Sequence, residues 1–282
     1  MIGNSFICRF FAACLLLLAG FSSEILHAAD APETIVLAST TSVDNSGLLA
    51  AILPGFTAAT GIMVRVLGQG TGHALDTARR GDADLVLVHN PEAEQKFIAE
   101  GHGINRRQIA WNDFILVGPT ADPAHVAGGH DAVAALAAIA RAQQPFVSRG
   151  DRSGTNELER RLWTATGIDP ESGRGTWYFD MAVGMGKALE DAAAMPAYTL
   201  SDRGTWISFK NKAPLKVVVE EDPKLVNRYV VIELDPAKHP SAKLVAAHRL
   251  AEWLVSPVGQ KAIGDFVIGG EQPFHPSAAE LR

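Results

Sequence analysis

The chain is poor in cysteine, in aromatic residues and in clustered positive charge. It has only two cysteines, Cys8 and Cys14, in 282 residues, and 7% of the residues are aromatic. Lysine and arginine never occur in a run longer than two, and the formal net charge is −6. Proteins that bind nucleic acid in general carry a basic patch or stripe, so we expect no nucleic-acid partner.

The first 29 residues predict a cleaved secretory signal peptide. Arg9 precedes an apolar run that includes Leu15–Leu18, and a stretch of small residues follows and ends near Ala28 and Ala29. This order is typical of exported proteins, and the apolar run is too short to span a bilayer. We therefore predict that residues 1–29 are removed and that the mature protein is periplasmic.

Both cysteines lie inside the predicted signal peptide, so the mature chain would contain none. Their loss excludes cysteine nucleophiles, thiolate metal sites and disulfides. The 253 remaining residues (282 minus 29) are enough for an apolar core without such cross-links. Hydrophobic residues make up 47% and charged residues 20%, which is typical of a globular protein with one large domain or two lobes.

Strands and helices alternate along the predicted mature chain. Residues 34–38, 63–67 and 85–89 are short apolar runs, and each precedes a segment with helical spacing or a helix start signal. This alternation predicts an α/β fold with a parallel sheet covered by helices. Further strands are expected at 114–118, 146–148, 198–200, 217–219 and 229–234, and further helices at 128–141, 156–166, 187–194, 241–255 and 257–266.

The turns between strands and helices are unusually rich in Ser, Thr and Gly. Five of them share this composition: residues 39–42, 70–72, 149–155, 184–186 and 201–205. In an open α/β sheet such turns lie at the carboxyl ends of the strands, where ligands bind. Helix N-termini present unpaired N–H groups, and hydroxyls add neutral donors. Each Ser or Thr alone could be a simple helix cap, but five converging turns would bind a small anion.

The segment Ser148–Thr155 adds a cation to one of these turns. Arg149 is followed by Asp151 and then by the helix start Ser153-Gly154-Thr155. A guanidinium binds an oxyanion with two parallel hydrogen bonds and keeps its charge at every accessible pH. We expect Asp151 to hold Arg149 in place, so that this segment contributes the charged donor of an oxyanion site.

Motifs for other kinds of chemistry are incomplete or missing. Gly68-x-Gly70-x-x-His73 lacks the third glycine of a dinucleotide fingerprint, and Gly186-Lys187 lacks the remainder of a phosphate-binding loop. The eight histidines after residue 29 form no metal-binding motif, so we predict no metal site and no cofactor. A Ser/His/Asp triad is assembled in space, so an exported hydrolase stays a distant alternative.

Taken together, these segments resemble the TupA family, whose members are the tungstate-binding components of ABC importers. The resemblance extends over nearly all of the predicted mature chain, and its most specific parts are Thr40-Thr41-Ser42 and the Ser148–Thr155 block. The family's usual opening, Thr-Thr-Thr-Ser, begins here with Ser39, which keeps a hydroxyl. The other segments that carry the likeness are residues 43–49, Gly70-Thr71-Gly72, Gly81–Asp84 and Tyr198–Thr205.

The resemblance implies a two-lobed periplasmic binding protein of the type II kind, with a mainly parallel, helix-flanked sheet in each lobe. Lobe one would comprise residues 30–118 and 228–282, and lobe two residues 119–227. The anion would bind in the cleft between the lobes, and closure about the hinge would bury it. Such a protein is not an enzyme. Its partners would be a membrane permease with its ATPase, and we expect it to be a monomer.

The resemblance also implies which residues bind the anion. They are Thr41, Ser42, Thr71 and Gly72 in lobe one, and Arg149, Ser153, Gly154, Thr155 and Gly186 in lobe two. The Arg-x-x-x-Ser-Gly-Thr block also occurs in phosphate-binding proteins, so molybdate, phosphate and sulfate stay open beside tungstate. The third strand ends in Val88-His89-Asn90, without the carboxylate that would accept a proton from phosphate. This favours a fully ionised dianion, although Asp44 or Asp202 could reach the site.

Overall fold

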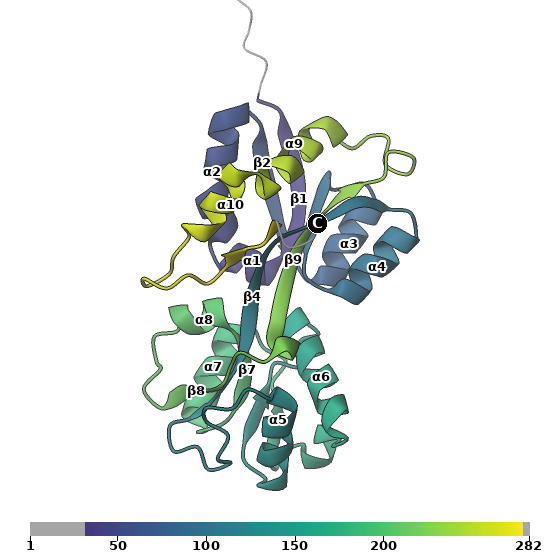
Figure 1. Ribbon diagram of the computed structural model, residues 1–282. Coiled ribbons are helices and arrows are strands. Elements are labelled where there is room, and N and C mark those ends of the chain that lie inside the picture. The colour runs from purple at the N-terminus through teal and green to yellow at the C-terminus, as the bar shows by residue number, and fades with distance from the viewer. Residues whose placement is uncertain (1–31, 279–282) are drawn as a thin grey trace, which may run out of the picture. The chain divides into compact units, whose positions relative to one another are not determined.

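The computed structural model describes residues 32–278 (Figure 1). The predicted signal peptide, and residues 30 and 31 of predicted lobe one, lie outside this range. Within it, no helix is both long enough and apolar enough to cross a membrane.

Ten strands and ten α-helices occur in the described chain. The strands are β1 (Thr34–Thr40), β2 (Met63–Gln69), β3 (Leu85–Val88), β4 (Gly103–Pro119), β5 (Phe146–Ser148), β6 (Tyr178–Asp180), β7 (Thr199–Asp202), β8 (Leu215–Val219), β9 (Val226–Leu234) and β10 (His275–Pro276). The helices are α1 (Thr41–Asn45), α2 (Leu48–Thr60), α3 (Thr71–Arg79), α4 (Pro91–Ala99), α5 (Ala132–Arg141), α6 (Gly154–Thr166), α7 (Met185–Ala194), α8 (Arg203–Ser208), α9 (Leu244–Val255) and α10 (Pro257–Gly264), with short 3₁₀ turns at Pro170–Gly173 and Pro223–Leu225.

The main sheet has the order β10-β4-β9-β3-β1-β2, and β7 and β8 both pair with β4. Strand β1 is parallel to β2 and β3, and β5 is parallel to β6. All pairings of β4 and β9 are antiparallel. The α/β class is confirmed, but the expectation of mainly parallel sheets is wrong: parallel pairing within residues 32–278 is limited to β1–β3, to β5–β6 and to isolated bridges such as that between Phe146 of β5 and Tyr198 just before β7. The alternation of strand and helix that predicted it concerned only the first 100 residues and carried no information on how later strands pair.

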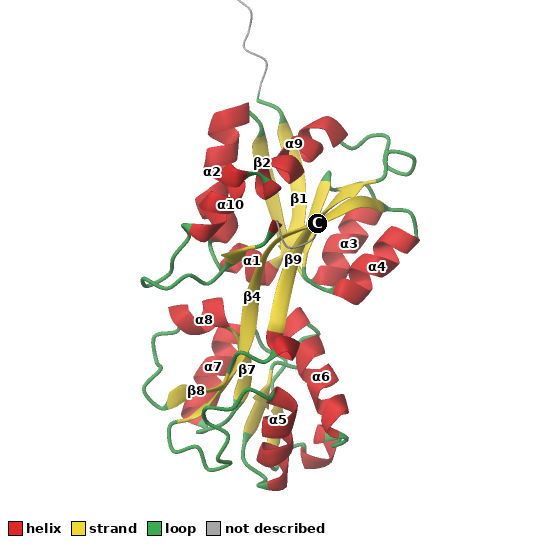
Figure 2. Cartoon of the chain, viewed as in Figure 1, coloured by secondary structure: helices red, strands yellow, loops and turns green. Residues whose placement is uncertain are grey.

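Strand β4 is the longest and is shared by two parts of the sheet (Figure 2). Its residues from Gly103 to Asp113 pair with β9, whereas its residues from Phe114 to Pro119 pair with β7 and β8. The sequence predicted only the second part. The first part contains polar residues, a left-handed Asn105 (φ 49°) and two register shifts against β9, which together hide the strand periodicity.

The hydrophobic core is divided at the same place. Two clusters of buried side chains draw only on residues 35–110 and 229–274, and two others draw only on residues 114–225. Helices α2, α9 and α10 pack on one face of the β1–β3 region, and α3 and α4 cover the other face (Figure 1). Two separate cores joined by β4 and β9 are what a two-lobed α/β protein requires. The exact boundaries after residues 118 and 227 stay predictions.

Candidate anion-binding site

The turns after β1 and β2 lie next to each other. The two strands are parallel and in register up to the pair Thr40–Gln69, so the helix starts at Thr41 and Thr71 emerge side by side. Helix α1 is capped by the Thr40 hydroxyl, which accepts from the Val43 N–H at 3.4 Å. Helix α3 follows Gly70 and has no side-chain cap in the described structure. The N–H groups of its first turn, which include that of Gly72, therefore remain available as donors.

Arg149 and the start of α6 form a second donor group. Arg149 is only 8% exposed, forms an ion pair with Asp151 and donates to the Thr155 hydroxyl at 3.3 Å. The predicted Arg149–Asp151 contact is therefore present. Ser153 caps α6 by accepting from the Asn156 N–H at 3.3 Å. The guanidinium is thus held close to a helix N-terminus, where the dipole also favours a negative ligand.

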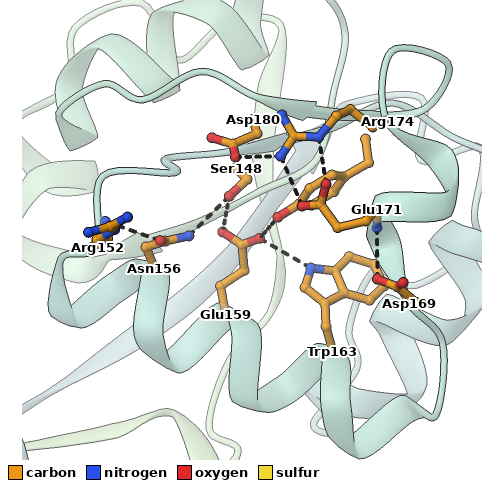
Figure 3. Close-up of polar contacts among 10 residues, drawn as sticks. Ser148, Arg152, Asn156, Glu159, Trp163, Asp169, Glu171, Arg174 and Asp180 are labelled. Atoms are coloured by element: carbon orange, nitrogen blue, oxygen red, sulfur yellow. Dashed lines mark hydrogen bonds and ion pairs between the residues drawn. The ribbon is translucent and has the colours of Figure 1, made fainter.

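The loop between Arg149 and Ser153 is fixed by tight local geometry. Gly150 has a φ of 61°, and a Cβ atom there would lie 1.4 Å from an oxygen of Asp180, so only glycine fits. Arg152 also has a left-handed backbone, with φ 58°. Its N–H donates to the side-chain oxygen of Asn156 at 3.2 Å (Figure 3). The loop therefore presents Arg149 in one arrangement.

Helix α7 begins beside this loop. The Val183 N–H donates to the Arg149 carbonyl at 2.8 Å, which places the following turn against β5. Gly184 precedes the helix and provides no side-chain cap in this part of the described chain. The first turn of α7 therefore has N–H groups without intrahelical partners, including that of Gly186, and this third helix start lies close to the loop after Arg149.

Three buried donors near these turns lack a hydrogen-bond partner among residues 32–278. They are the Ser39 hydroxyl in β1, the Thr71 hydroxyl at the start of α3 and the Nε of Arg149. Buried polar atoms are nearly always paired, and an unpaired one is costly. A guest with acceptor oxygens, such as an oxyanion, would satisfy both Thr71 and Arg149.

The two carboxylates that were considered as acceptors have neighbours of their own in the structure. Asp202 caps α8, where it accepts from the Thr205 N–H at 2.7 Å and from the Thr205 hydroxyl at 2.8 Å. The turn at 201–205 is therefore capped by its own carboxylate, which disfavours an anion at this helix start. The Asp44 carboxylate lies against the backbone of Gly68, where an added Cβ would come within 2.6 Å of it.

His89, which the sequence did not identify, joins the two donor groups. Its Nε2 lies 3.2 Å from the Ser42 hydroxyl, and its Nδ1 lies 2.9 Å from the side-chain oxygen of Asn227. A Cβ atom on Gly154 would lie 2.9 Å from the imidazole Cε1. Ser42 and Gly154 therefore meet at the same side chain. Like the predicted donors, His89 directly follows a strand, and that position was the available signal.

A buried carboxyl supports the Arg149 side of the site (Figure 3). Glu159 of α6 is 1% exposed and accepts from the Ser148 hydroxyl at 2.8 Å, from the Tyr178 hydroxyl at 2.9 Å and from the Trp163 indole at 3.2 Å. Asn156 donates to the same Ser148 hydroxyl at 3.2 Å. Burial raises the pKa of Glu159 to about 7 in spite of these donors. Residue 148, which precedes Arg149, is thereby tied to helix α6.

The nine predicted residues thus fall into two groups. Thr41, Ser42, Thr71 and Gly72 follow β1 and β2, and Arg149, Ser153, Gly154, Thr155 and Gly186 surround the loop after β5. The only link between the groups described above runs through His89. No cluster of three or more His, Cys, Asp or Glu side chains suited to a metal ion occurs within residues 32–278.

The chain as a whole is similar to known proteins. A family model described as a PBP superfamily domain matches residues 27–258. The chain is 42% identical over 254 residues to the tungstate-binding protein TupA of Peptoclostridium acidaminophilum, covering 89% of this chain and 88% of that protein. Among solved structures, the tungstate-binding protein TupA from Desulfovibrio alaskensis G20 is 42% identical with a TM-score of 0.80, covering 87% of this chain and 99% of that one. The tungstate ABC transporter structure from Geobacter sulfurreducens is 39% identical with a TM-score of 0.74, covering 84% and 100%.

Proposed function

Because the chain belongs to the TupA family of ABC-transporter solute-binding proteins, we propose that it captures tungstate outside the cytoplasm and delivers it to a membrane permease. It is a binding protein and not an enzyme. Its partners are the permease and the ATPase of the importer, and its ligand is an oxyanion.

The unpartnered buried donors, together with helix starts that have no side-chain cap, support this proposal. The Arg149 Nε and the Thr71 hydroxyl are buried without partners in the described chain, and α3 and α7 begin without side-chain caps at Gly70 and Gly184. A fully ionised dianion such as tungstate needs only donors. Phosphate keeps a proton near neutral pH and would need an acceptor, and Asp202 is already committed to capping α8.

We assign ligand binding to the two donor groups acting together. The proposed ligand residues are Thr41, Ser42, Thr71, Gly72, Arg149, Ser153, Gly154, Thr155 and Gly186. Lobe one (residues 30–118 and 228–282) would supply the first four and lobe two (residues 119–227) the rest, and closure of the lobes would bury the anion between them. Molybdate has the same charge and nearly the same size, so it is the competing ligand within this proposal.

Titration calorimetry of the mature protein with tungstate, molybdate, sulfate and phosphate tests the proposal. Tight binding of tungstate, with sulfate and phosphate far weaker, is expected, and the ligand should raise the melting temperature by mass action. The absence of both heat and thermal shift with all four anions would reject it. Tighter binding of phosphate than of tungstate would replace it with a phosphate-binding role.

The location and the assembly state are part of the same proposal. Removal of residues 1–29 would release a periplasmic monomer. Intact-mass measurement of protein recovered from the periplasm should show a chain that begins near Asp30, and light scattering should give the mass of one chain. An unprocessed chain or a stable dimer would contradict these two statements without affecting ligand choice.

A further inference from the structure

His89 lies at the carboxyl end of β3 and contacts three other elements. It meets Ser42 in the turn after β1, Asn227 in β9 and the first residue of α6, Gly154. Its ring also packs against that of Tyr229, with 4.9 Å between the centroids. Two of these neighbours, Ser42 and Gly154, are proposed ligand residues from opposite donor groups.

The hydrogen bonds around Asn227 determine which imidazole nitrogen carries the proton. The Asn227 amide NH₂ donates to the side-chain oxygen of Asn112 at 2.9 Å and to the Tyr229 hydroxyl at 2.7 Å. The amide oxygen is therefore the group that faces His89, and an amide oxygen only accepts. Nδ1 must then be the protonated nitrogen of His89, and Nε2 is left as an acceptor.

The same logic continues to the start of α1. Because Nε2 of His89 is an acceptor, the Ser42 hydroxyl donates to it across the 3.2 Å contact. The Thr40 hydroxyl lies 3.1 Å from the Ser42 oxygen and already accepts from the Val43 N–H, so it donates to Ser42. Every proton in this chain of four side chains is thereby assigned, and the Ser42 hydroxyl has one orientation.

The ring stays neutral in this setting. Burial lowers the pKa of His89 to about 4, and the bond to Asn227 offsets this only partly. A small cavity of about 100 Å³ beside the ring is also lined by Arg161 of α6, Lys224 of the second 3₁₀ turn and Arg228 of β9. The hydrogen-bonded series Thr40–Ser42–His89–Asn227, called the relay below, therefore carries no charge at any pH near neutrality.

The contact with Gly154 limits how α6 approaches. A Cβ atom there would lie 2.9 Å from Cε1 of the imidazole, which is closer than two carbon atoms can pack. The ring is held by Asn227, Ser42 and Tyr229, so it has little freedom to retreat. The position of His89 thus sets the spacing between the first turn of α6 and the turn after β1.

We propose that His89 is a positioning residue for the oxyanion: held as the Nδ1–H tautomer by Asn227, it accepts the Ser42 hydroxyl proton and so fixes Ser42, which leaves the backbone N–H of Ser42 in the first turn of α1 as the donor for the anion, and it sets the distance from Ser42 to the N-terminus of α6. This inference rests on the proposed function, because it assigns a role within the same binding site. It explains why glycine is required at position 154, at the start of a helix where many other residues are tolerated.

The connection Ser42–His89–Asn227 has the order of a hydrolytic triad, but its electrostatics are unsuited to catalysis. A general base works best when its pKa is near the working pH, whereas burial lowers the pKa of His89 to about 4. A neutral amide in the third position also fails to stabilise an imidazolium, which is the main task of the triad carboxylate. The relay therefore orients a hydroxyl and does not activate it.

A double-mutant cycle with tungstate as the probe tests the role in binding. His89→Phe keeps a ring of similar volume and removes both hydrogen bonds, so it should weaken tungstate binding about five- to tenfold. His102→Phe is the matched control, because His102 hydrogen-bonds His239 at 3.1 Å rather than any residue of the site, and it should leave affinity within about twofold.

The cycle itself combines His89→Ala with Gly154→Ala, and both single variants and the double variant are measured beside wild type. Gly154→Ala should weaken binding about fivefold in the wild-type background, and by less than about twofold in the His89→Ala background, because the steric conflict is then removed. An equal loss in both backgrounds, or wild-type affinity in His89→Phe, would overturn the inference. If wild-type protein binds no tungstate, the proposed function fails instead, which this design separates from failure of the variants.

A measurement on the unmutated protein guards against variants that do not fold. Nitrogen-15 correlation spectra of the histidine rings should show His89 as the neutral Nδ1–H tautomer from about pH 8 down to about pH 5. An Nε2–H tautomer, or protonation near pH 6.5, would contradict the assigned relay. This readout does not depend on any ligand.

Discussion

The two sides of the site are supported by two buried titratable groups whose environments act on them in opposite directions. Burial lowers the pKa of His89 to about 4 and raises the pKa of Glu159 to about 7. The physical cause is the same, because removal from water disfavours the charged form of either group. The result differs: His89 remains neutral near physiological pH, whereas Glu159 changes its charge there.

This contrast has a consequence for stability. Between about pH 4.5 and pH 7 the folded protein keeps a proton on Glu159 that the unfolded chain releases, so stability falls as pH rises through this window. Between about pH 6.5 and pH 4 the unfolded chain protonates His89 and the folded protein does not, so stability falls as pH falls. The two effects oppose each other from about pH 4.5 to pH 6.5.

The largest expected loss of tungstate affinity follows from replacing Arg149, the charged donor on the side of the site that Glu159 supports. Arg149→Ala should weaken tungstate binding by more than tenfold, because a buried charge-assisted contact is lost. Arg149→Lys should recover only part, since lysine lacks the planar fork. Thr71→Val, on the His89 side, removes a neutral donor and should have a smaller effect of about fivefold. Calorimetry on the three variants measures the order, and a larger loss in Thr71→Val than in Arg149→Ala would reverse this account of the two sides.

Glu159→Gln should remove one of the two opposing pH effects. The variant keeps the volume but no longer ionises, so it should gain stability relative to wild type as pH rises: the difference in free energy of unfolding, variant minus wild type, should increase by about 2–3 kcal/mol between about pH 5 and pH 8. Denaturant titrations across that range measure the difference. Leu162→Ala, a change in α6 without a titratable group, is the control and should give a difference that is constant with pH. A constant difference in Glu159→Gln would show that this carboxyl does not titrate as described.

Asn227→Asp should bring the pKa of His89 closer to physiological pH, where that of Glu159 already lies. A carboxylate against Nδ1 favours the imidazolium, so the pKa of His89 should rise by about one unit or more. Ring spectra recorded during a pH titration measure the shift. Asn112→Asp is a demanding control, because it adds the same charge one hydrogen bond further away and should raise the pKa of His89 less. Equal shifts in the two variants would mean that direct contact with Asn227 is not what determines the protonation of the ring.

How far the sequence predicts this molecule depends on the range of the interactions involved. Helix α4 was predictable from Pro91, which opens it, and α2 was predictable to its end at Gly61, which has the expected left-handed φ of 73°. These are local signals. The first half of β4 was not predictable, because Asn105 and the register shifts break the periodicity that a strand is recognised by.

The site divides in the same way. Arg149, Asp151 and Ser153 are neighbours in sequence, and their contacts follow from spacing alone. His89 and Asn227 are 138 positions apart, and only the pairing of β3 with β9 brings them together. Glu159 belongs to an otherwise ordinary helix, and its raised pKa depends on its packing against Ser148 and Tyr178. The sequence places His89 at the end of a strand but gives no sign of its partners, and nothing in the sequence marks Glu159.

The smallest expected effect concerns the buried hydroxyl of Ser39, which has no partner among residues 32–278. Ser39→Ala should change the free energy of unfolding by less than about 1 kcal/mol, or stabilise slightly, because no hydrogen bond is lost. Tungstate affinity should stay within about twofold, since Ser39 is not among the proposed ligand residues. Thermal unfolding and calorimetry measure both, and a tenfold loss of affinity would add Ser39 to the site.

The position of the bound metal atom tests the central claim most directly. Tungsten scatters X-rays anomalously, so crystals of the mature protein grown with tungstate would locate it without reference to any model. The account predicts a single strong tungsten peak, with oxygens of the bound tungstate about 3 Å from the Arg149 guanidinium and the Thr71 hydroxyl. A peak in contact with neither side chain would contradict the claim that these two donor groups bind one anion.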